Sequence, residues 1–241
     1  MITNPDITVA IAVWNQETYI RQAIESTFTN KSTVEIVIIN DGSTDRTKEV
    51  IGSIELPPTI SLKLINQDHS GNMGSTLAKA YEQATGRYIS ELGSDDYFLP
   101  NALDILCSFM DSNPDVGLCY SGYHSLKDGI LSSPTPHPDN QYYQWTNNPQ
   151  KRLLQNNFIA PPCALRRSIY KKVQYDPTQE INEDYLFKLE LSRVTEFKQI
   201  KQPLAVLRIR SDSISNNPNT KDKMRFWESE ARRKVIERHG Y

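Results

Sequence analysis

The sequence of 241 residues is poor in cysteine and contains no long apolar run. Its three cysteines, Cys107, Cys119 and Cys163, have no metal-like spacing and lie in apolar stretches, so we expect buried free thiols in a reducing compartment. No apolar run approaches the ~18–20 residues that a membrane span needs. The first residues lack the basic segment of a signal peptide. These absences favour a cytoplasmic protein.

The chain also lacks an excess of charge of either sign and several familiar nucleotide-binding motifs. It has 27 Lys and Arg against 29 Asp and Glu, a net charge of −2, which argues against a nucleic-acid partner. There is no G-x-x-x-x-G-K-[ST] loop, and residues 71–74 do not match G-x-G-x-x-G, which disfavours kinases and dehydrogenases. The four histidines have no zinc-like spacing with the cysteines.

What the first half does contain is an alternation of short β-branched runs with amphipathic helical patterns. We expect strands at residues 7–13, 34–39, 60–64 and 88–92, and helices within 20–28, 45–54, 77–84 and 100–110. This spacing is typical of βαβ units and predicts a mostly parallel α/β sheet. The second half is less regular. It predicts strands at 116–121 and 204–209, a helix near 185–189, and a long loop over 123–150 that is either functional or partly mobile.

Polar groups follow three of the predicted strands. They are residues 14–15, residues 40–43 and residues 93–96, and the last segment ends in Asp95 and Asp96. In parallel sheets ligands bind beyond the carboxyl ends of the strands, so we expect these groups to form one site.

The adjacent carboxylates Asp95 and Asp96 are the most informative of these groups. Ionised groups resist losing water unless something compensates their charge, and oxygen ligands suit Mg²⁺ or Mn²⁺ held together with substrate phosphates. The alternative is a solvated turn before the helix announced by Pro100.

Four motifs in order resemble family 2 of the glycosyltransferases. They lie at residues 7–15, 35–45, 86–96 and 164–185, and the similarity spans roughly residues 6–215. The resemblance implies a GT-A fold, an α/β architecture whose central sheet is mostly parallel, flanked by helices, and mixed in the acceptor half. It also implies inverting transfer from a nucleotide-sugar, usually UDP-linked, with Mn²⁺ or Mg²⁺. In a single domain, residues 6–121 would bind the nucleotide-sugar, 122–215 would form the acceptor half, and 216–241 a C-terminal lid and helix.

The resemblance assigns the nucleotide-binding residues at the first two strand ends. Asp41 would bond the uracil ring, with Ala12, Val13 and Trp14 in the same pocket. Trp14 stands where the family often has Tyr, and an ordinary packed aromatic is the alternative. His69 stands where the family tends to have Asn, which leaves the donor contacts of that loop open.

The resemblance also assigns the residues around the diphosphate. Asp96 would ligate the metal, and Asp95 would hold the sugar or ribose. Arg210 replaces the His of the family's R-x-H element, and an arginine grips a diphosphate through paired donors but cannot ligate metal. Surface salt bridging is the alternative for this arginine.

Asp184 would be the general base that takes the proton of the acceptor hydroxyl. A positioned base contributes ~10²–10⁴-fold in rate. Its neighbour Glu183 would orient Asp184 or bind the acceptor. The alternative for both is a helix N-terminus, where acidic residues interact favourably with the helix dipole.

The C-terminal residues 221–241 are locally basic, with seven Lys and Arg against four acidic residues. Met224, Trp227, Ala231 and Val235 form one stripe of a helix. This stripe fits packing onto the domain or peripheral association of residues 221–239 with the cytoplasmic face of the inner membrane.

The sequence thus predicts a metal-dependent inverting glycosyltransferase that uses a UDP-sugar. Its acceptor would be a glycan or lipid-linked saccharide in bacterial surface polysaccharide assembly, such as O-antigen or capsule. Three alternatives stay open: a sugar-nucleotide-forming nucleotidyltransferase, a two-carboxylate hydrolase, and a degenerate non-catalytic binding module. A nucleotidyltransferase should carry a Gly-rich basic loop after its first strand, and residues 13–17 do not form such a loop.

Overall fold

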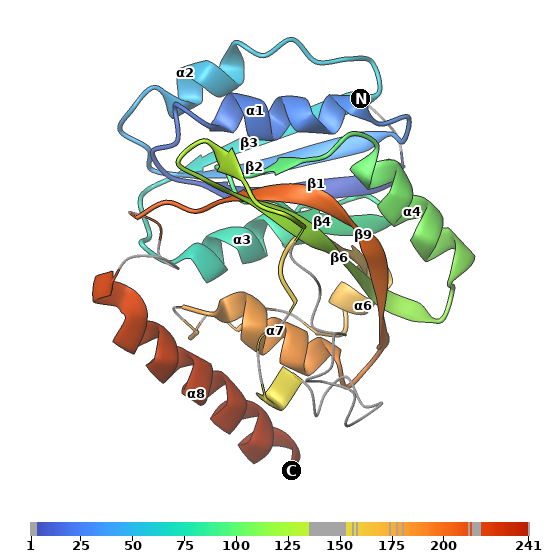
Figure 1. Ribbon diagram of the computed structural model, residues 1–241, viewed down its shortest axis with the longest axis vertical. Coiled ribbons are helices and arrows are strands. Elements are labelled where there is room, and N and C mark those ends of the chain that lie inside the picture. Colours follow the sequence, from blue (N-terminus) through green and yellow to red (C-terminus); the bar gives the residue numbers. More distant parts are fainter. Residues whose placement is uncertain are drawn as a thin grey trace.

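One twisted sheet crosses the molecule, with helices on both of its faces (Figure 1). The structure is a computed structural model that describes residues 4–134 and 153–240, apart from 156, 158, 174, 177, 180, 212 and 214–217. The strands are β1 (Ile7–Val13), β2 (Val34–Asp41), β3 (Ile60–Gln67), β4 (Tyr88–Glu91), β5 (Tyr97–Phe98), β6 (Val116–Lys127), β7 (Ile130–Leu131), β8 (Cys163–Arg166) and β9 (Glu196–Arg208). The α-helices are α1 (Ile20–Glu25), α2 (Thr47–Gly52), α3 (Met73–Glu82), α4 (Ala102–Ser112), α6 (Arg167–Tyr170), α7 (Glu183–Leu191) and α8 (Lys221–His239), with 3₁₀ turns at Ser26–Thr29 and Pro218–Thr220.

The strand order is β3-β2-β1-β4-β8-β6-β9-β5, with β7 paired to β6. The four strands from β3 to β4 are parallel, as the βαβ spacing of the sequence predicts. Beyond β4 the sheet is mixed, because β8 is antiparallel to both β4 and β6, whereas β9 runs parallel to β6. The prediction of a mostly parallel sheet that becomes mixed in the second half is therefore confirmed.

Alternate residues of the central strands pack into two separate cores. In β1, Ile7, Val9, Ile11 and Val13 face one core, while Ala10 and Ala12 face the other. Successive side chains of a strand point to opposite faces, so a strand covered on both faces is apolar throughout. Helices α1, α2 and α4 cover the first face, and α3, α6, α7 and α8 cover the second (Figure 1).

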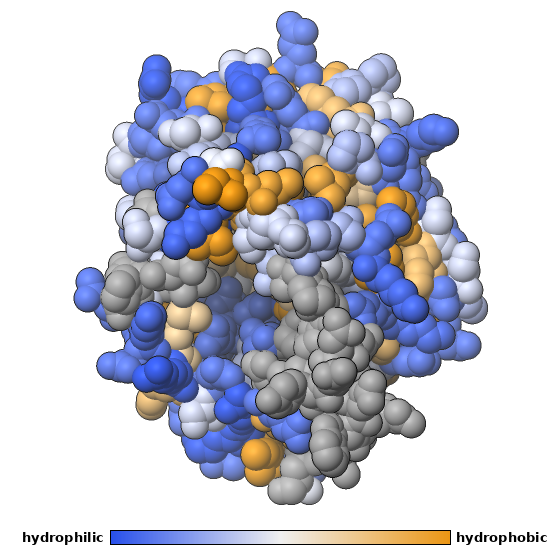
Figure 2. All heavy atoms as spheres, viewed as in Figure 1, coloured by the Kyte–Doolittle hydropathy of each residue, from blue (hydrophilic) through white to orange (hydrophobic). Residues whose placement is uncertain are grey.

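The second half differs in detail from the sequence prediction. Residues 123–127 continue β6, and residues 130–131 form β7, so the expected long loop begins later than predicted. Its residues 135–150 lie outside the described part of the chain. Figure 2 shows apolar side chains exposed in the region of this hairpin, where Ile130 is 74% exposed. Strand β9 begins at Glu196, eight residues before the predicted start, because its first half pairs with β6 despite its polar residues.

The C-terminal helix α8 uses its predicted stripe to pack against the domain. Ala231 and Val235 are buried in the second core. Arg238 bridges to Asp176 and Glu190, so basic residues of this helix also bind the domain. Peripheral membrane association through residues 221–239 stays a prediction. Nowhere in the described segments does a helix combine the length and the apolar character that crossing a bilayer demands.

Helix α3 approaches α7 closely at Gly74, the second residue of the helix. A Cβ at this position would lie 2.6 Å from Cγ and 2.7 Å from Cβ of Glu183. Real side chains do not approach this closely, so the two helices can keep their spacing only if residue 74 has no side chain. Gly74 therefore sets the position of the N-terminal turn of α7.

We expect Gly74→Ala to lower the free energy of unfolding by about 1–3 kcal/mol, because the added methyl group overpacks the contact with Glu183. The matched control is Gly52→Ala at the end of α2, where an added Cβ meets nothing within 4 Å. This control should leave stability unchanged or raise it by up to about 1 kcal/mol. Denaturant unfolding measures both, and equal effects would contradict the close approach.

Candidate functional site

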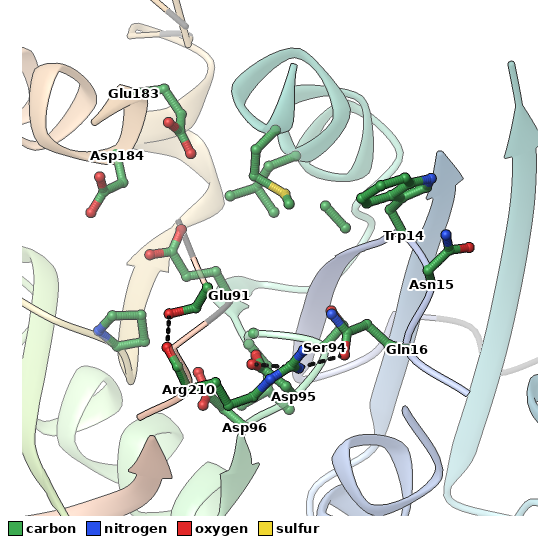
Figure 3. Close-up of a pocket in the computed structure, with 17 residues that line it drawn as sticks. Trp14, Asn15, Gln16, Glu91, Ser94, Asp95, Asp96, Glu183, Asp184 and Arg210 are labelled. Carbon is green, nitrogen blue, oxygen red and sulfur yellow. Dashed lines mark hydrogen bonds and ion pairs between the residues drawn. The ribbon is translucent and has the colours of Figure 1, made fainter. Parts of the chain in front are cut away.

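A cavity of about 620 Å³ opens at the carboxyl ends of β1 and β4 (Figure 3). Six residues that the sequence predicted for the site line it, namely Ala12, Trp14, Asp95, Asp96, Asp184 and Arg210. Glu183 lines it as well. The structure thus brings together segments of the chain that lie far apart in sequence, because the parallel strands end at one edge of the sheet.

Three predicted residues do not line this cavity. The side chain of Val13 is fully buried in the core on the other face of the sheet, so only its backbone is left for a ligand. Asp41 and His69 lie beside the cavity, and the His69 ring stacks on Trp14 with ring centroids 4.6 Å apart. Trp14 itself is 46% exposed. An exposed indole at a strand end offers a flat face to an aromatic base.

The Asp41 carboxylate is buried and holds the loop that carries His69. Its Oδ1 accepts hydrogen bonds from Gln67 Nε2 and from the Ser70 backbone N–H, and its Oδ2 lies 3.0 Å from His69 Nδ1. Burial raises the pKa of Asp41, but the hydrogen bonds from Gln67 and Ser70 outweigh it and hold the pKa below its ordinary value. Asp41 is therefore an ionised carboxylate that orders the loop carrying His69, beside Trp14.

Two arginines at the end of β9 meet the Asp95 and Asp96 pair. The Arg210 Nη1 lies 3.2 Å from Asp95 Oδ2 and donates to Gln16 Oε1 at 2.8 Å. The backbone N–H of Arg208 donates to Asp96 Oδ1 at 2.8 Å, and its guanidinium donates to the Asp95 carbonyl. Arg210 is thus an ion-pair partner of Asp95 inside the cavity rather than a surface salt bridge.

Asp96 carries negative charge that the protein compensates only in part. Burial and the charge of Asp95 raise its pKa to about 7, against the lowering effect of the Arg208 N–H. No cluster of three or more His, Cys, Asp or Glu that could hold a metal occurs among the described residues. The donor set nevertheless fits Mg²⁺ or Mn²⁺, since such ions take one or two carboxylates and complete their coordination with water and substrate phosphates.

The opposite wall of the cavity is the first turn of α7, which carries Glu183 and Asp184 (Figure 3). The helix begins after Asn182, whose φ of 56° is a conformation that Asn tolerates better than most residues. Burial and the charge of Asp184 raise the pKa of Glu183 to about 8, so Glu183 is mostly protonated at neutral pH. The Asp184 side chain is 28% exposed, and its Oδ2 accepts from Lys188 Nζ at 2.7 Å.

Sequence reasoning missed two charged residues at this wall. Glu91 lines the cavity from the end of β4, and Lys188 lies one turn after Asp184 in α7. Glu91 sits inside a run that reads as an apolar strand, so nothing in the sequence marks it as functional. The spacing of Lys188 from Asp184 does indicate a contact, because residues four apart in a helix share one face.

Three comparisons with known proteins bear on this chain: sequence relatives, solved structures and a family model. An uncharacterised glycosyltransferase of Methanocaldococcus jannaschii is 25% identical over 188 residues, which cover 76% of this chain and 63% of the relative. A second uncharacterised glycosyltransferase, from Rickettsia prowazekii, is 29% identical over 220 residues, covering 89% and 67%. The chain thus spans about two thirds of the length of these relatives.

Solved structures share the fold. S. aureus TarS 1–349 in complex with UDP-GlcNAc superposes with a TM-score of 0.73 at 18% identity, covering 92% of this chain and 65% of that one. The mannosyltransferase PcManGT from Pyrobaculum calidifontis, in complex with GDP-Man and Mn²⁺, gives a TM-score of 0.70 at 15% identity, covering 99% and 66%. These similarities confirm the predicted GT-A fold.

The family model described as glycosyl transferase family 2 matches residues 8–174. The matched segment contains the carboxyl ends of β1, β2 and β4 and the Asp95 and Asp96 pair. The resemblance drawn from the motifs is therefore confirmed, and the chain belongs to glycosyltransferase family 2.

Proposed function

We propose that this protein is an inverting glycosyltransferase that moves a sugar from a UDP-sugar to a hydroxyl group of an acceptor. The observation that carries the proposal is the convergence of Trp14, the Asp95 and Asp96 pair, and Asp184 around one cavity. The nucleotide base would stack on Trp14, the diphosphate would lie near Arg210, and the acceptor would enter beside Asp184. Structural relatives that bind UDP-GlcNAc and GDP-Man support a nucleotide-sugar donor.

The reaction follows from the two walls of the cavity. The carboxylate of Asp184 accepts the proton of the acceptor hydroxyl, whose oxygen bonds to the anomeric carbon. The bond from that carbon to the diphosphate breaks, and its electron pair leaves with UDP. Attack from the face opposite the leaving group inverts the anomeric centre. Arg210 binds the diphosphate through paired donors, and Asp95 holds the sugar or the ribose.

Asp96, with Asp95 beside it, would hold a Mn²⁺ or Mg²⁺ ion together with the diphosphate. When bound, the ion neutralises charge that develops on the leaving group. The Mn²⁺ in the structure of PcManGT supports this part of the proposal.

We further propose the acceptor class and the division of labour within the domain. The acceptor would be a glycan or lipid-linked saccharide of bacterial surface polysaccharide, as the family resemblance implies. Residues 6–121 would bind the donor, 122–215 would bind the acceptor, and 216–241 would close as a lid and helix. Of the predicted lid and helix, residues 216, 217 and 241 lie outside the described residues.

Titration of UDP into the protein by calorimetry tests the donor site. We expect Mn²⁺ to strengthen UDP binding, and Asp96→Ala to weaken Mn²⁺-dependent binding at least about tenfold, or ~1.4 kcal/mol. Asp115→Ala is the control, because Asp115 is an exposed acid outside the cavity. A UDP affinity that changes neither with Mn²⁺ nor in Asp96→Ala would refute the metal assignment.

The pH should change the effect of Mn²⁺. Because the pKa of Asp96 is raised to about 7, its carboxyl is ionised above that pH and protonated below it. A cation needs the ionised form, so the gain in UDP affinity from Mn²⁺ should fall about tenfold between about pH 8 and about pH 6. Calorimetry at both pH values measures the gain, and Asp96→Asn should reduce the pH dependence to that of the UDP phosphate itself, whose second pKa is about 6. A constant gain in the wild type would count against Asp96 as ligand.

The role of Asp184 is tested by nucleotide release from a panel of UDP-sugars and GDP-mannose, with saccharide acceptors. We expect Asp184→Asn to lower turnover by ~10²–10⁴-fold, because the substituted amide cannot take the proton. UDP binding should be retained, since the variant changes the acceptor wall. Unchanged turnover would remove the base role and favour another enzyme class, whereas UDP binding without turnover in the wild type would favour the binding-module alternative.

A further inference from the structure

A buried lysine lies beneath the acceptor wall of the cavity. The Lys188 side chain is only 2% exposed, and lysine is almost never buried without partners. Its Nζ donates to Asp184 Oδ2 at 2.7 Å and to the Ile159 carbonyl at 2.8 Å, and it lies 3.8 Å from Glu91 Oε1. Two hydrogen bonds and one ion pair thus hold the ammonium group in place.

Glu91 anchors this lysine to the sheet. The carboxylate is buried at the end of β4, where its Oε2 accepts hydrogen bonds from Tyr175 Oη at 3.1 Å and Tyr81 Oη at 3.3 Å. Both tyrosines are buried, so Glu91 cannot move away without leaving them unpaired. This series of contacts therefore connects Asp184, through Lys188 and Glu91, to the central strand β4.

Apart from Lys188, the titratable groups that the structure describes around Asp184 are acids. Glu183 neighbours it in α7, Glu91 faces it from β4, and Tyr81, Tyr175 and the Cys163 thiol surround this group from the elements packed against it. Burial lowers the pKa of Lys188, but the charges of Asp184 and Glu91 outweigh it and hold the pKa above its ordinary value. Lys188 is therefore an ammonium ion at neutral pH.

From this geometry we infer that Lys188 is the positioning residue of the base: it binds Oδ2 of Asp184, favours the ionised carboxylate, and leaves Oδ1 for the acceptor hydroxyl. Among the described residues, none donates a side-chain hydrogen bond to Oδ1. The proton of the acceptor would move to Oδ1 while Lys188 keeps its own protons. The inference rests on the proposed function, since it requires Asp184 to be the base.

The test compares Lys188→Met, which removes the charge at similar length, with Lys188→Arg, which keeps it. Lys234→Met is the matched control, because Lys234 is a largely buried lysine paired with Asp176 at 3.6 Å, far from the cavity in α8. Nucleotide release from UDP-GlcNAc, or from the most active sugar of the donor panel, is measured across the pH range with saccharide or water as acceptor. Melting temperature reports folding of each variant.

We expect Lys188→Met to lower kcat at neutral pH at least about tenfold and to move the acidic limb of the pH–rate profile upward by about one pH unit or more. The sign follows because loss of a neighbouring cation disfavours the ionised base. The KM for the donor should change less than about twofold, since Lys188 does not contact the donor end. Lys188→Arg should restore the limb toward the wild-type position, and Lys234→Met should leave it unchanged.

A loss of kcat with no movement of the acidic limb would show a merely structural lysine and overturn the inference, as would an unchanged kcat. If Lys188→Met does not fold because Glu91 is left unpaired, the double variant Glu91→Gln/Lys188→Met is compared with Glu91→Gln alone, so that only the lysine differs between the two. Asp184→Asn is measured in parallel. Activity that survives Asp184→Asn defeats the proposed function, whereas activity that is lost there but insensitive to Lys188→Met defeats only this inference.

Discussion

Parallel hydrogen bonding of β1 to β2 on one side and to β4 on the other fixes where the candidate site lies. Val13 pairs with Asn40, and Ala10 pairs with Glu91, so the segments that follow all three strands emerge at one edge of the sheet. The strands can pair in this register because each is buried almost throughout and is covered by helices on both sides. The polar segments at the ends of these strands are not covered by the helices, and the cavity opens there.

The charge balance of the cavity is a consequence of this convergence. Five carboxyl groups line it, those of Glu91, Asp95, Asp96, Glu183 and Asp184, and Arg210 is the one cation among its described lining residues. A diphosphate is itself anionic, so a bound nucleotide-sugar would add to the repulsion. Burial, together with this excess of negative charge, raises the pKa values of Asp96 and Glu183. A divalent cation delivered with the donor would neutralise part of this excess.

The sequence was sufficient for those parts of the structure that depend on local patterns. Apolar runs and helical stripes predicted β1 to β4 and their helices, and polar strand ends predicted where Trp14, Asp95 and Asp96 would meet. It was insufficient for contacts between distant segments. Glu91 binds Tyr175 and Lys188, which follow it by more than 80 residues, and no periodicity encodes such a pairing. The first half of β9 escaped prediction because its exposed face is polar.

The pairing of β5 with β9 is the long-range contact with the largest effect on the site. Tyr97 pairs with Val206, so the strand directly after Asp96 lies beside the strand that ends in Arg208. This antiparallel pairing brings the Arg208 N–H to Asp96 and the Arg210 guanidinium to Asp95. The two carboxylates differ: Asp95 has an ion-pair partner, whereas Asp96 accepts the Arg208 N–H, and burial and the charge of Asp95 still raise its pKa to about 7 against that hydrogen bond and the two arginine charges. This difference is a physical reason to propose Asp96, rather than Asp95, as the carboxylate that would bind a metal ion.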